Sequence, residues 1–129
     1  MEEHGPDARH FSVSESRERK AATFHRVLSL YVRDCWDART PVRASELAQL
    51  LDLSLPYLSQ RCRELVGVNL SRALKRQQVR YAAKLLRETG LNNAEIAEAA
   101  GFGTEKTLFR VFGMLCGTTP QAYRRHMKK

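Results

Sequence analysis

The chain is 129 residues long and carries 22 Lys and Arg against 14 Asp and Glu, which gives a net charge of +8 and an isoelectric point near 9.9. This length supports one domain, or two very small ones that share an element, with a real hydrophobic core. So large a positive excess favours a polyanionic partner such as a nucleic acid. The alternative explanation of the charge is a solubilising surface.

Several function classes have no support in the sequence. The three cysteines form no Cys-x-x-Cys pair, and the four histidines lack zinc-ligand spacing, so no metal site is expected. We expect Cys35, Cys62 and Cys116 to be reduced and to pack in the core of a cytosolic protein. No apolar run is long enough to span a membrane, and no signal peptide is recognisable. Paired carboxylates, a Ser-His arrangement and a phosphate-binding loop are all missing, which argues against an enzyme and predicts no cofactor.

The N-terminal part of the sequence predicts a disordered leading segment and then one amphipathic helix. Residues 1–13 show no hydrophobic period, which predicts a disordered lead. From about residue 14 a helix is expected, because apolar side chains recur at three- and four-residue steps from Phe24 to Cys35. It should end near residues 37–40, since Pro41 disfavours helical geometry in the residue before it.

Residues 43–67 predict a first helix-turn-helix. A helix from about Ala44 to Leu51 is followed by a turn and by a second helix that Ser54 caps. Pro56 suits the first turn of that second helix, and Gly67 is the usual left-handed stop.

A long helix is expected over about 70–89. Four basic side chains recur on it at four-residue spacing: Arg72, Arg76, Arg80 and Lys84. We interpret them as a stripe that faces DNA phosphates, and the alternative is an ordinary solvated face.

A second helix-turn-helix is expected over about 92–117. Asn92 and Glu95 have the spacing of a capping box, and Thr104 can cap the second helix. The core side of that helix is predicted to consist of Leu108, Phe109, Phe112 and Leu115. Gly117 ends the helix, and a short closing helix leads to the basic tail.

The two halves are related by an internal repeat. Leu47-Ala48 matches Ile96-Ala97 at an offset of 49, and Gly67 matches Gly117 at an offset of 50. This predicts two copies of one structural unit. A joining helix of about 18 residues measures roughly 27 Å, and successive major grooves on one face of DNA are about 34 Å apart. A single chain could therefore offer two recognition helices to adjacent grooves.

A helical wheel identifies the side chains that face away from the core of each recognition helix. Paired hydrogen bonds to adenine suit Gln60, Arg63 can read guanine or bind a phosphate, and the methyl group of Thr107 suits thymine. Lys106 and Arg110 rank highest, because residues near the start of a recognition helix reach base edges most easily. Contacts to DNA bases are therefore expected from seven residues: Pro56, Ser59, Gln60, Arg63, Lys106, Thr107 and Arg110.

The second half also carries a motif that resembles a known family. An Ile96-Ala97 pair, a Gly101-Phe102 turn, the stretch Phe109-Arg110-Val111-Phe112 and a final Gly-Thr-Thr-Pro before Tyr123-Arg124 follow one another in order. This order is similar to the C-terminal signature of AraC/XylS transcription regulators. The similarity extends over about residues 24–125 and is looser in the first half, where Cys62, Ala73 and Gln78 depart from the pattern, as does Asn93 later.

The resemblance implies an all-α fold of about seven helices, with two helix-turn-helix units joined by a long linker helix, in a DNA-binding domain over residues 14–129. It implies a bacterial activator or repressor that is cytoplasmic and nucleoid-associated, binds double-stranded DNA as a monomer at an asymmetric site and contacts RNA polymerase. The chain looks like the stand-alone class, and a fragment of a larger regulator is the alternative. A competing functional hypothesis is a protein-interaction module whose basic face docks an acidic protein partner.

Overall fold

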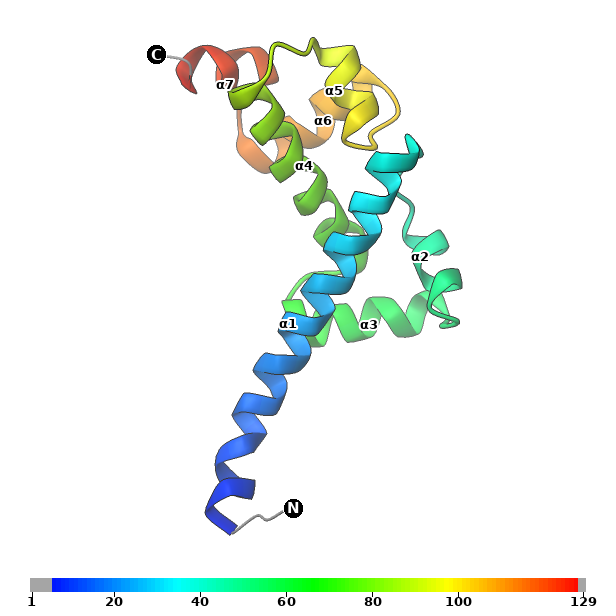
Figure 1. The fold of residues 1–129 in the computed structure, drawn as a ribbon, viewed down its shortest axis with the longest axis vertical. Helices are drawn as coiled ribbons and strands as arrows, with labels where there is room; N and C mark the ends of the chain where they lie inside the picture. Colours follow the sequence, from blue (N-terminus) through cyan, green and yellow to red (C-terminus); the bar gives the residue numbers. More distant parts are fainter. Residues whose placement is uncertain (1–5, 128–129) are drawn as a thin grey trace.

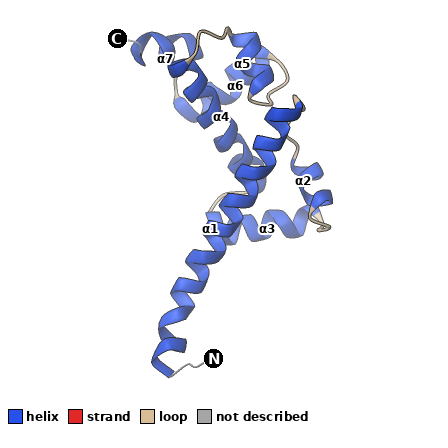
Figure 2. Ribbon diagram, in the orientation of Figure 1, coloured by secondary structure: helices blue, strands red, loops and turns tan. Residues whose placement is uncertain are grey.

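The computed structural model describes the backbone of residues 6–127 and the side chains of residues 16–127. Within these residues the fold consists of seven helices and contains no strand (Figures 1 and 2). The helices are α1 (Pro6–Ala38), α2 (Ala44–Leu50), α3 (Leu55–Val66), α4 (Leu70–Glu88), α5 (Asn93–Ala99), α6 (Glu105–Cys116) and α7 (Pro120–Met127). The predicted all-α fold with two helix-turn-helix units is confirmed.

Helix α1 begins earlier than the sequence predicted. A disordered lead was expected over residues 1–13, but the helix already starts at Pro6, and residues 1–5 lie outside the described part. The sequence shows no hydrophobic period at the start of this helix. Figure 1 shows that the N-terminal part of α1 extends away from the other helices. A helix segment that extends away from the rest of the fold needs no apolar stripe. The fixed φ of Pro6 suits its first turn.

The helices enclose two hydrophobic cores, and α4 contributes to both. The first core joins α1, α2, α3 and the N-terminal half of α4 through Leu28, Tyr31, Val32, Cys35, Leu47, Ala48, Leu58, Cys62, Leu70, Ala73 and Leu74. The second joins the rest of α4 to α5 and α6 through Val79, Ala82, Ala83, Leu85, Leu86, Ile96, Ala97, Ala99, Ala100, Phe102, Leu108, Val111 and Phe112. Full burial of one such large side chain stabilises the fold by about 1.5–3 kcal/mol.

The repeat seen in the sequence is also present in the packing. Leu58 and Leu108 are both buried, and so are Cys62 and Phe112, which occupy equivalent positions of α3 and α6. The two recognition helices end alike, since Gly67 and Gly117 adopt positive φ angles of 93° and 72°. The first core is thus built around a thiol where the second core has a phenyl ring.

Polar contacts attach the connecting segments to the cores. The Tyr31 hydroxyl accepts a hydrogen bond from the Arg43 backbone N–H at 3.0 Å and donates one to the Glu46 carboxylate at 2.6 Å, which joins α1 to the start of α2. Burial and the Glu46 carboxylate raise the pKa of the Tyr31 phenol well above its ordinary value. At the other end, Arg124 of α7 donates to the carbonyl groups of Leu86, Thr89 and Leu91. Helix α7 therefore satisfies acceptors at the C-terminal end of α4 that would otherwise lack partners.

The two units also touch each other directly at the turn between α5 and α6. Gln78, the one buried polar side chain found in the described residues, donates to the Ala100 carbonyl oxygen at 3.1 Å. The Val42 N–H donates to the Gly101 carbonyl oxygen at 3.2 Å. Gly101 has a φ of +82°, and a Cβ atom there would lie 2.8 Å from Cγ2 of Val42. Glycine is required at this contact for both its φ angle and its lack of a side chain.

Two glycine substitutions test this packing, and they are expected to change the free energy of unfolding in opposite directions. Gly101→Ala should lower the free energy of unfolding by about 1–3 kcal/mol, because it adds left-handed strain and a clash with Val42. Gly113→Ala is the matched control, since Gly113 lies inside α6 with nothing within 4 Å of its Cβ position. It should raise the free energy of unfolding by about 0.5–1 kcal/mol. Urea unfolding of both variants measures the two changes, and equal shifts would contradict the close contact at Gly101.

Candidate nucleic-acid interface

Helix α3 presents the first set of predicted base contacts. It starts at a side-chain cap, in which the Ser54 hydroxyl accepts from the Tyr57 N–H at 3.2 Å. Leu58 and Cys62 hold one side of the helix in the core. The predicted contacts lie on the other side, where Pro56, Gln60 and Arg63 are exposed and Ser59 is half-buried.

One of these side chains is already engaged within α3. The Gln60 amide donates to the Glu64 carboxylate at 3.4 Å, and Arg61 donates to the same carboxylate at 2.7 Å. These two hydrogen bonds, from Gln60 and then Arg61, hold the pKa of Glu64 below its ordinary value. The Gln60 carbonyl oxygen remains available as an acceptor, which is half of the paired contact that an adenine needs.

Helix α6 presents the second set. The Thr104 hydroxyl accepts from the Thr107 N–H at 3.1 Å, so the helix starts at the predicted cap. Lys106 and Arg110 are exposed, whereas Thr107 is half-buried and its hydroxyl lies 3.1 Å from that of Thr104. The methyl group of Thr107 is thus the part that is left for a thymine contact.

The predicted core side of α6 is wrong at one position. Phe109 was expected to be buried but is 42 % exposed, and Val111 is buried instead. On a helical wheel the core centres between Leu108, Val111 and Phe112, and Phe109 lies about 110° from that centre. Phe109 therefore stands beside Arg110 on the outer surface. The wheel angle was the signal that could have identified it as an additional contact candidate.

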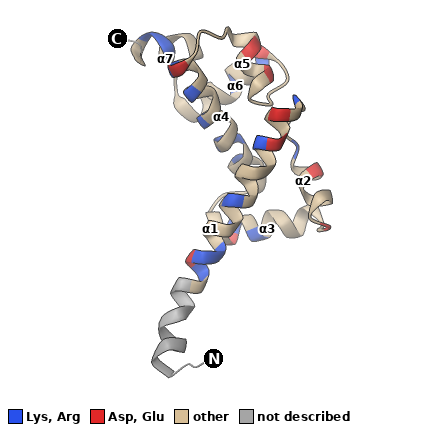
Figure 3. Cartoon of the chain, in the orientation of Figure 1, with Lys and Arg blue, Asp and Glu red and all other residues tan. Residues whose placement is uncertain are grey.

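The four stripe residues Arg72, Arg76, Arg80 and Lys84 all lie exposed on α4, and Figure 3 marks the Lys and Arg positions of the chain in blue. The stripe residues border a concavity of about 770 Å³, which we call the basic concavity. Its other walls come from Arg33 and Trp36 of α1, Leu115 and Cys116 of α6, and Tyr123 of α7. Cys116 ends α6, whereas Lys106 lies near its start, about 15 Å away along the helix axis. The stripe thus lies near the C-terminal end of α6, whereas Lys106 and Thr107 lie near its start and Arg110 lies between.

Three aromatic rings contribute to the lining of the basic concavity. Trp36 stacks on Tyr81 with ring centroids 3.9 Å apart and an interplanar angle of 17°. Tyr123 packs edge-on against Phe112 and accepts a hydrogen bond from Arg87 at 2.8 Å. These contacts join α1 to α4, and α7 to α6 and α4, so the concavity lies where both units meet.

Comparison with known proteins identifies the family. A family model described as a helix-turn-helix domain matches residues 47–126, which include both helix-turn-helix units. The chain belongs to the AraC-type helix-turn-helix transcription regulators. This match confirms the resemblance that the motif beginning at Ile96 indicated. Regulators of this bacterial family bind DNA.

Relatives of this regulator are found among both sequences and structures. An uncharacterized HTH-type transcriptional regulator, YfiF of Bacillus subtilis, is 29 % identical over 97 residues, which cover 75 % of this chain and 30 % of YfiF. The chain thus spans about a third of that relative. The C-terminal domain of AraT, a response regulator from Geobacillus stearothermophilus, is 27 % identical with a TM-score of 0.70, covering 80 % of this chain and 84 % of that domain.

A further structural relative was solved together with DNA. The DNA-binding domain of the global transcriptional factor AdpA, in complex with a target DNA, is 26 % identical with a TM-score of 0.66, covering 77 % of this chain and 90 % of that one. None of the helices in the described part of the chain is both long and apolar enough to cross a membrane.

The cysteines do not all pack as the sequence predicted. Cys35 and Cys62 are buried in the first core, but Cys116 is exposed at the end of α6, which corrects the expectation for that residue. Its place on the wheel is about 90° from the centre of the core, so the last turn of α6 turns it outward. Nearby atoms still desolvate the thiol and raise the pKa of Cys116 above its ordinary value.

Thiol titration tests this arrangement. In the native protein Ellman's reagent should modify Cys116 in a single fast phase, and Cys35 and Cys62 should react only after denaturant is added. Because the thiolate is the nucleophile and the pKa of Cys116 is raised, the fast rate should keep increasing with pH beyond the ordinary thiol pKa. Cys116→Ser should abolish the fast phase, and a fast phase that survives in this variant would contradict the burial of the other two thiols.

Proposed function

We propose that this chain is a sequence-specific DNA-binding regulator that places α3 and α6 in adjacent major grooves. The main observation in support of this proposal is that both recognition helices pack onto one linker helix of 19 residues, which measures roughly 28 Å. This length is close to the spacing of about 34 Å between successive major grooves on one face of a duplex. The difference is small enough for a bend in the DNA to compensate.

Base reading is assigned to the exposed side chains of the two helices. On α3 these are Pro56, Ser59, Gln60 and Arg63, and on α6 they are Lys106, Thr107 and Arg110. Arg110 has the strongest chemical argument, because an exposed guanidinium can donate two parallel hydrogen bonds to guanine. The two sets share an arginine but otherwise differ in residue type, so each helix should prefer a different series of bases. A monomer therefore reads an asymmetric site.

Phosphate contacts are assigned to Arg72, Arg76, Arg80 and Lys84 of α4. Their charge supports this role, since phosphate neutralisation with counterion release supplies most of the sequence-independent affinity for DNA. The stripe lies toward the C-terminal end of α6, so the duplex must extend past the recognition helices to reach it. In a bacterial cell the chain would act in the cytoplasm, on the nucleoid, and would influence transcription through RNA polymerase.

The site size follows from the two-helix arrangement. Selection from a random duplex pool should return an asymmetric site of roughly 20 base pairs with two separate conserved blocks, because two grooves one turn apart are read. Circular-permutation gel shifts should show that the bound duplex is bent. A single compact block on straight DNA would instead mean that only one recognition helix is engaged.

A matched pair of variants separates base reading from phosphate contact. Arg110→Ala should weaken binding to the selected site by about 1–3 kcal/mol and relax the preference at one base pair. Arg76→Ala should weaken binding to selected and random duplexes alike and reduce the salt slope by about one. Fluorescence anisotropy over a salt series measures both effects. An acidic protein partner, the competing function, would predict no binding of duplex DNA by any of these proteins.

A further inference from the structure

The basic concavity concentrates positive charge beyond the α4 stripe. Two further cations, Arg33 of α1 and Arg87 of α4, join the four stripe residues around it, and none of its described lining residues is acidic. Arg87 donates only to the neutral Tyr123 hydroxyl, which leaves its charge uncompensated. A concave surface with one sign of charge and apolar walls focuses the electrostatic potential and attracts anions.

The shape of this surface suits a small molecule. Its volume of about 770 Å³ falls within the range of roughly 300–1,000 Å³ that is typical of small-molecule sites. A DNA duplex presents a convex row of phosphates, which can touch the rim along α4 but cannot fill a hollow bounded by four helices. Arg33 of α1 borders the same hollow as the α4 cations, and this arrangement suits a compact anion better than a strand.

The walls add a feature that phosphate groups alone do not need. Trp36, Tyr81 and Tyr123 contribute half-buried aromatic side chains to the lining of the concavity. Flat aromatic faces and guanidinium groups both stack on planar rings. The site thus combines several anion-binding groups with a surface for a ring.

We propose that the basic concavity binds a free ligand that carries two or more anionic groups on a planar ring system, as a nucleoside polyphosphate does. The binding itself requires no DNA. Its regulatory consequence rests on the proposed function, because the same α4 cations are assigned to DNA phosphates there. A bound ligand would occupy these cations and so weaken binding of the duplex.

Trp36 makes the first test direct, because it is the one tryptophan of the chain and lies in the wall of the concavity. ATP should change its fluorescence saturably in protein without DNA. Adenosine has the ring without the anions, and tripolyphosphate has the anions without the ring. Each should bind at least about tenfold more weakly than ATP, because each lacks one of the two kinds of contact.

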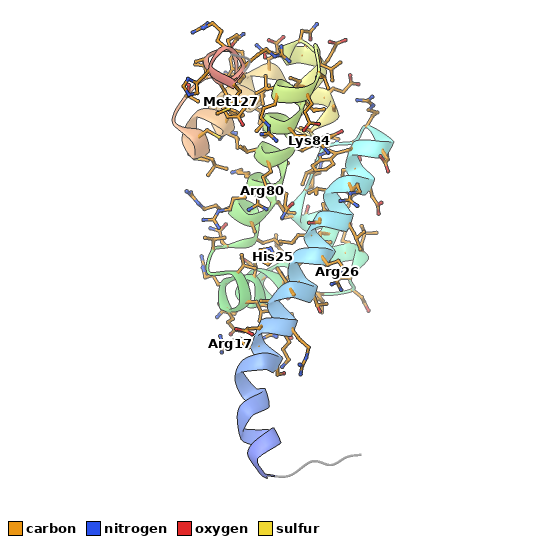
Figure 4. The ribbon with its side chains drawn as sticks, turned by 60° about the vertical axis from the view of Figure 1, so that its left-hand side comes forward. Arg17, His25, Arg26, Arg80, Lys84 and Met127 are labelled. Atoms are coloured by element: carbon orange, nitrogen blue, oxygen red, sulfur yellow. The ribbon has the colours of Figure 1, made fainter. Side chains whose placement is uncertain are left out.

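A pair of charge-matched variants locates the site. Arg80→Gln, in the stripe, should weaken ATP binding by about tenfold, as expected for the loss of one charge-assisted hydrogen bond. Arg17→Gln removes the same charge from an exposed position of α1 sixteen residues before Arg33, roughly 24 Å along the helix. Figure 4 labels Arg17 far from Arg80 and Lys84. This control should bind ATP like the parent protein, and thermal unfolding should show both variants to be folded.

The outcomes separate this proposal from the DNA-binding one. Absence of a saturable ATP signal, equal affinity for ATP and tripolyphosphate, or equal losses in both variants would overturn the ligand site and leave DNA binding untouched. If ATP binds as expected, it should also raise the apparent Kd for the selected duplex in the parent protein. In Arg80→Gln this shift should shrink, and a shift that is unchanged there would overturn the shared use of the α4 cations.

Discussion

The arrangement of both recognition helices depends on α4 being a member of two hydrophobic cores at once. Leu70 and Leu74 pack in the first core, and Ala82 and Leu86 pack in the second. Since each residue of an α-helix turns the side-chain direction by 100°, the number of residues between these pairs sets the angle between the two units. An insertion of one residue between Leu74 and Ala82 would rotate α6 about the α4 axis relative to α3. The angle between the two recognition helices is thus encoded in a spacing and not in any single contact.

The two units are copies in topology but not in packing quality. At equivalent positions the second unit buries Phe102 to 8 % exposure, whereas the first leaves Leu53 39 % exposed. Cys62 fills less volume than Phe112 at the matching place in the recognition helix. Buried area is the main source of stability, so the second unit has the more strongly determined structure. This agrees with the sequence, where the family motif is more complete after residue 96.

Sequence reasoning succeeded where a local rule determines the outcome. Caps at Ser54, Asn92 and Thr104 each require one side chain and one backbone N–H a few residues away, so they could be identified from spacing alone. It failed at residues on the edge of a helical face. Phe109 and Cys116 have apolar side chains, and the helical wheel places both at the edge of the core face, about 110° and 90° from its centre. At such an edge, burial depends on which neighbouring helix covers it, so the wheel angle marks these positions as uncertain but tertiary packing decides their exposure.

The early start of α1 and the basic concavity have a related explanation. Periodicity detects helices that pack against a core, so it could not find the part of α1 that extends away from the body. The stripe on α4 was visible as a spacing of four. That α1 and α7 would add Arg33, Trp36 and Tyr123 around it follows only from tertiary packing. The chemistry of one helix face was therefore predictable, but the site that surrounds it was not.

The stripe also shows how stability and binding are balanced in this fold. Its three i,i+4 pairs of like charges, from Arg72 to Lys84, each destabilise the helix by about 0.2–0.5 kcal/mol, or roughly 1 kcal/mol together. Nine buried residues hold α4 in the two cores, and each large one contributes more than that whole repulsion. The helix can therefore carry four uncompensated cations without unfolding. A helix that served only as a spacer would gain stability from a glutamate at Arg76 or Arg80, so the repeated positive charge supports the proposed anion contacts.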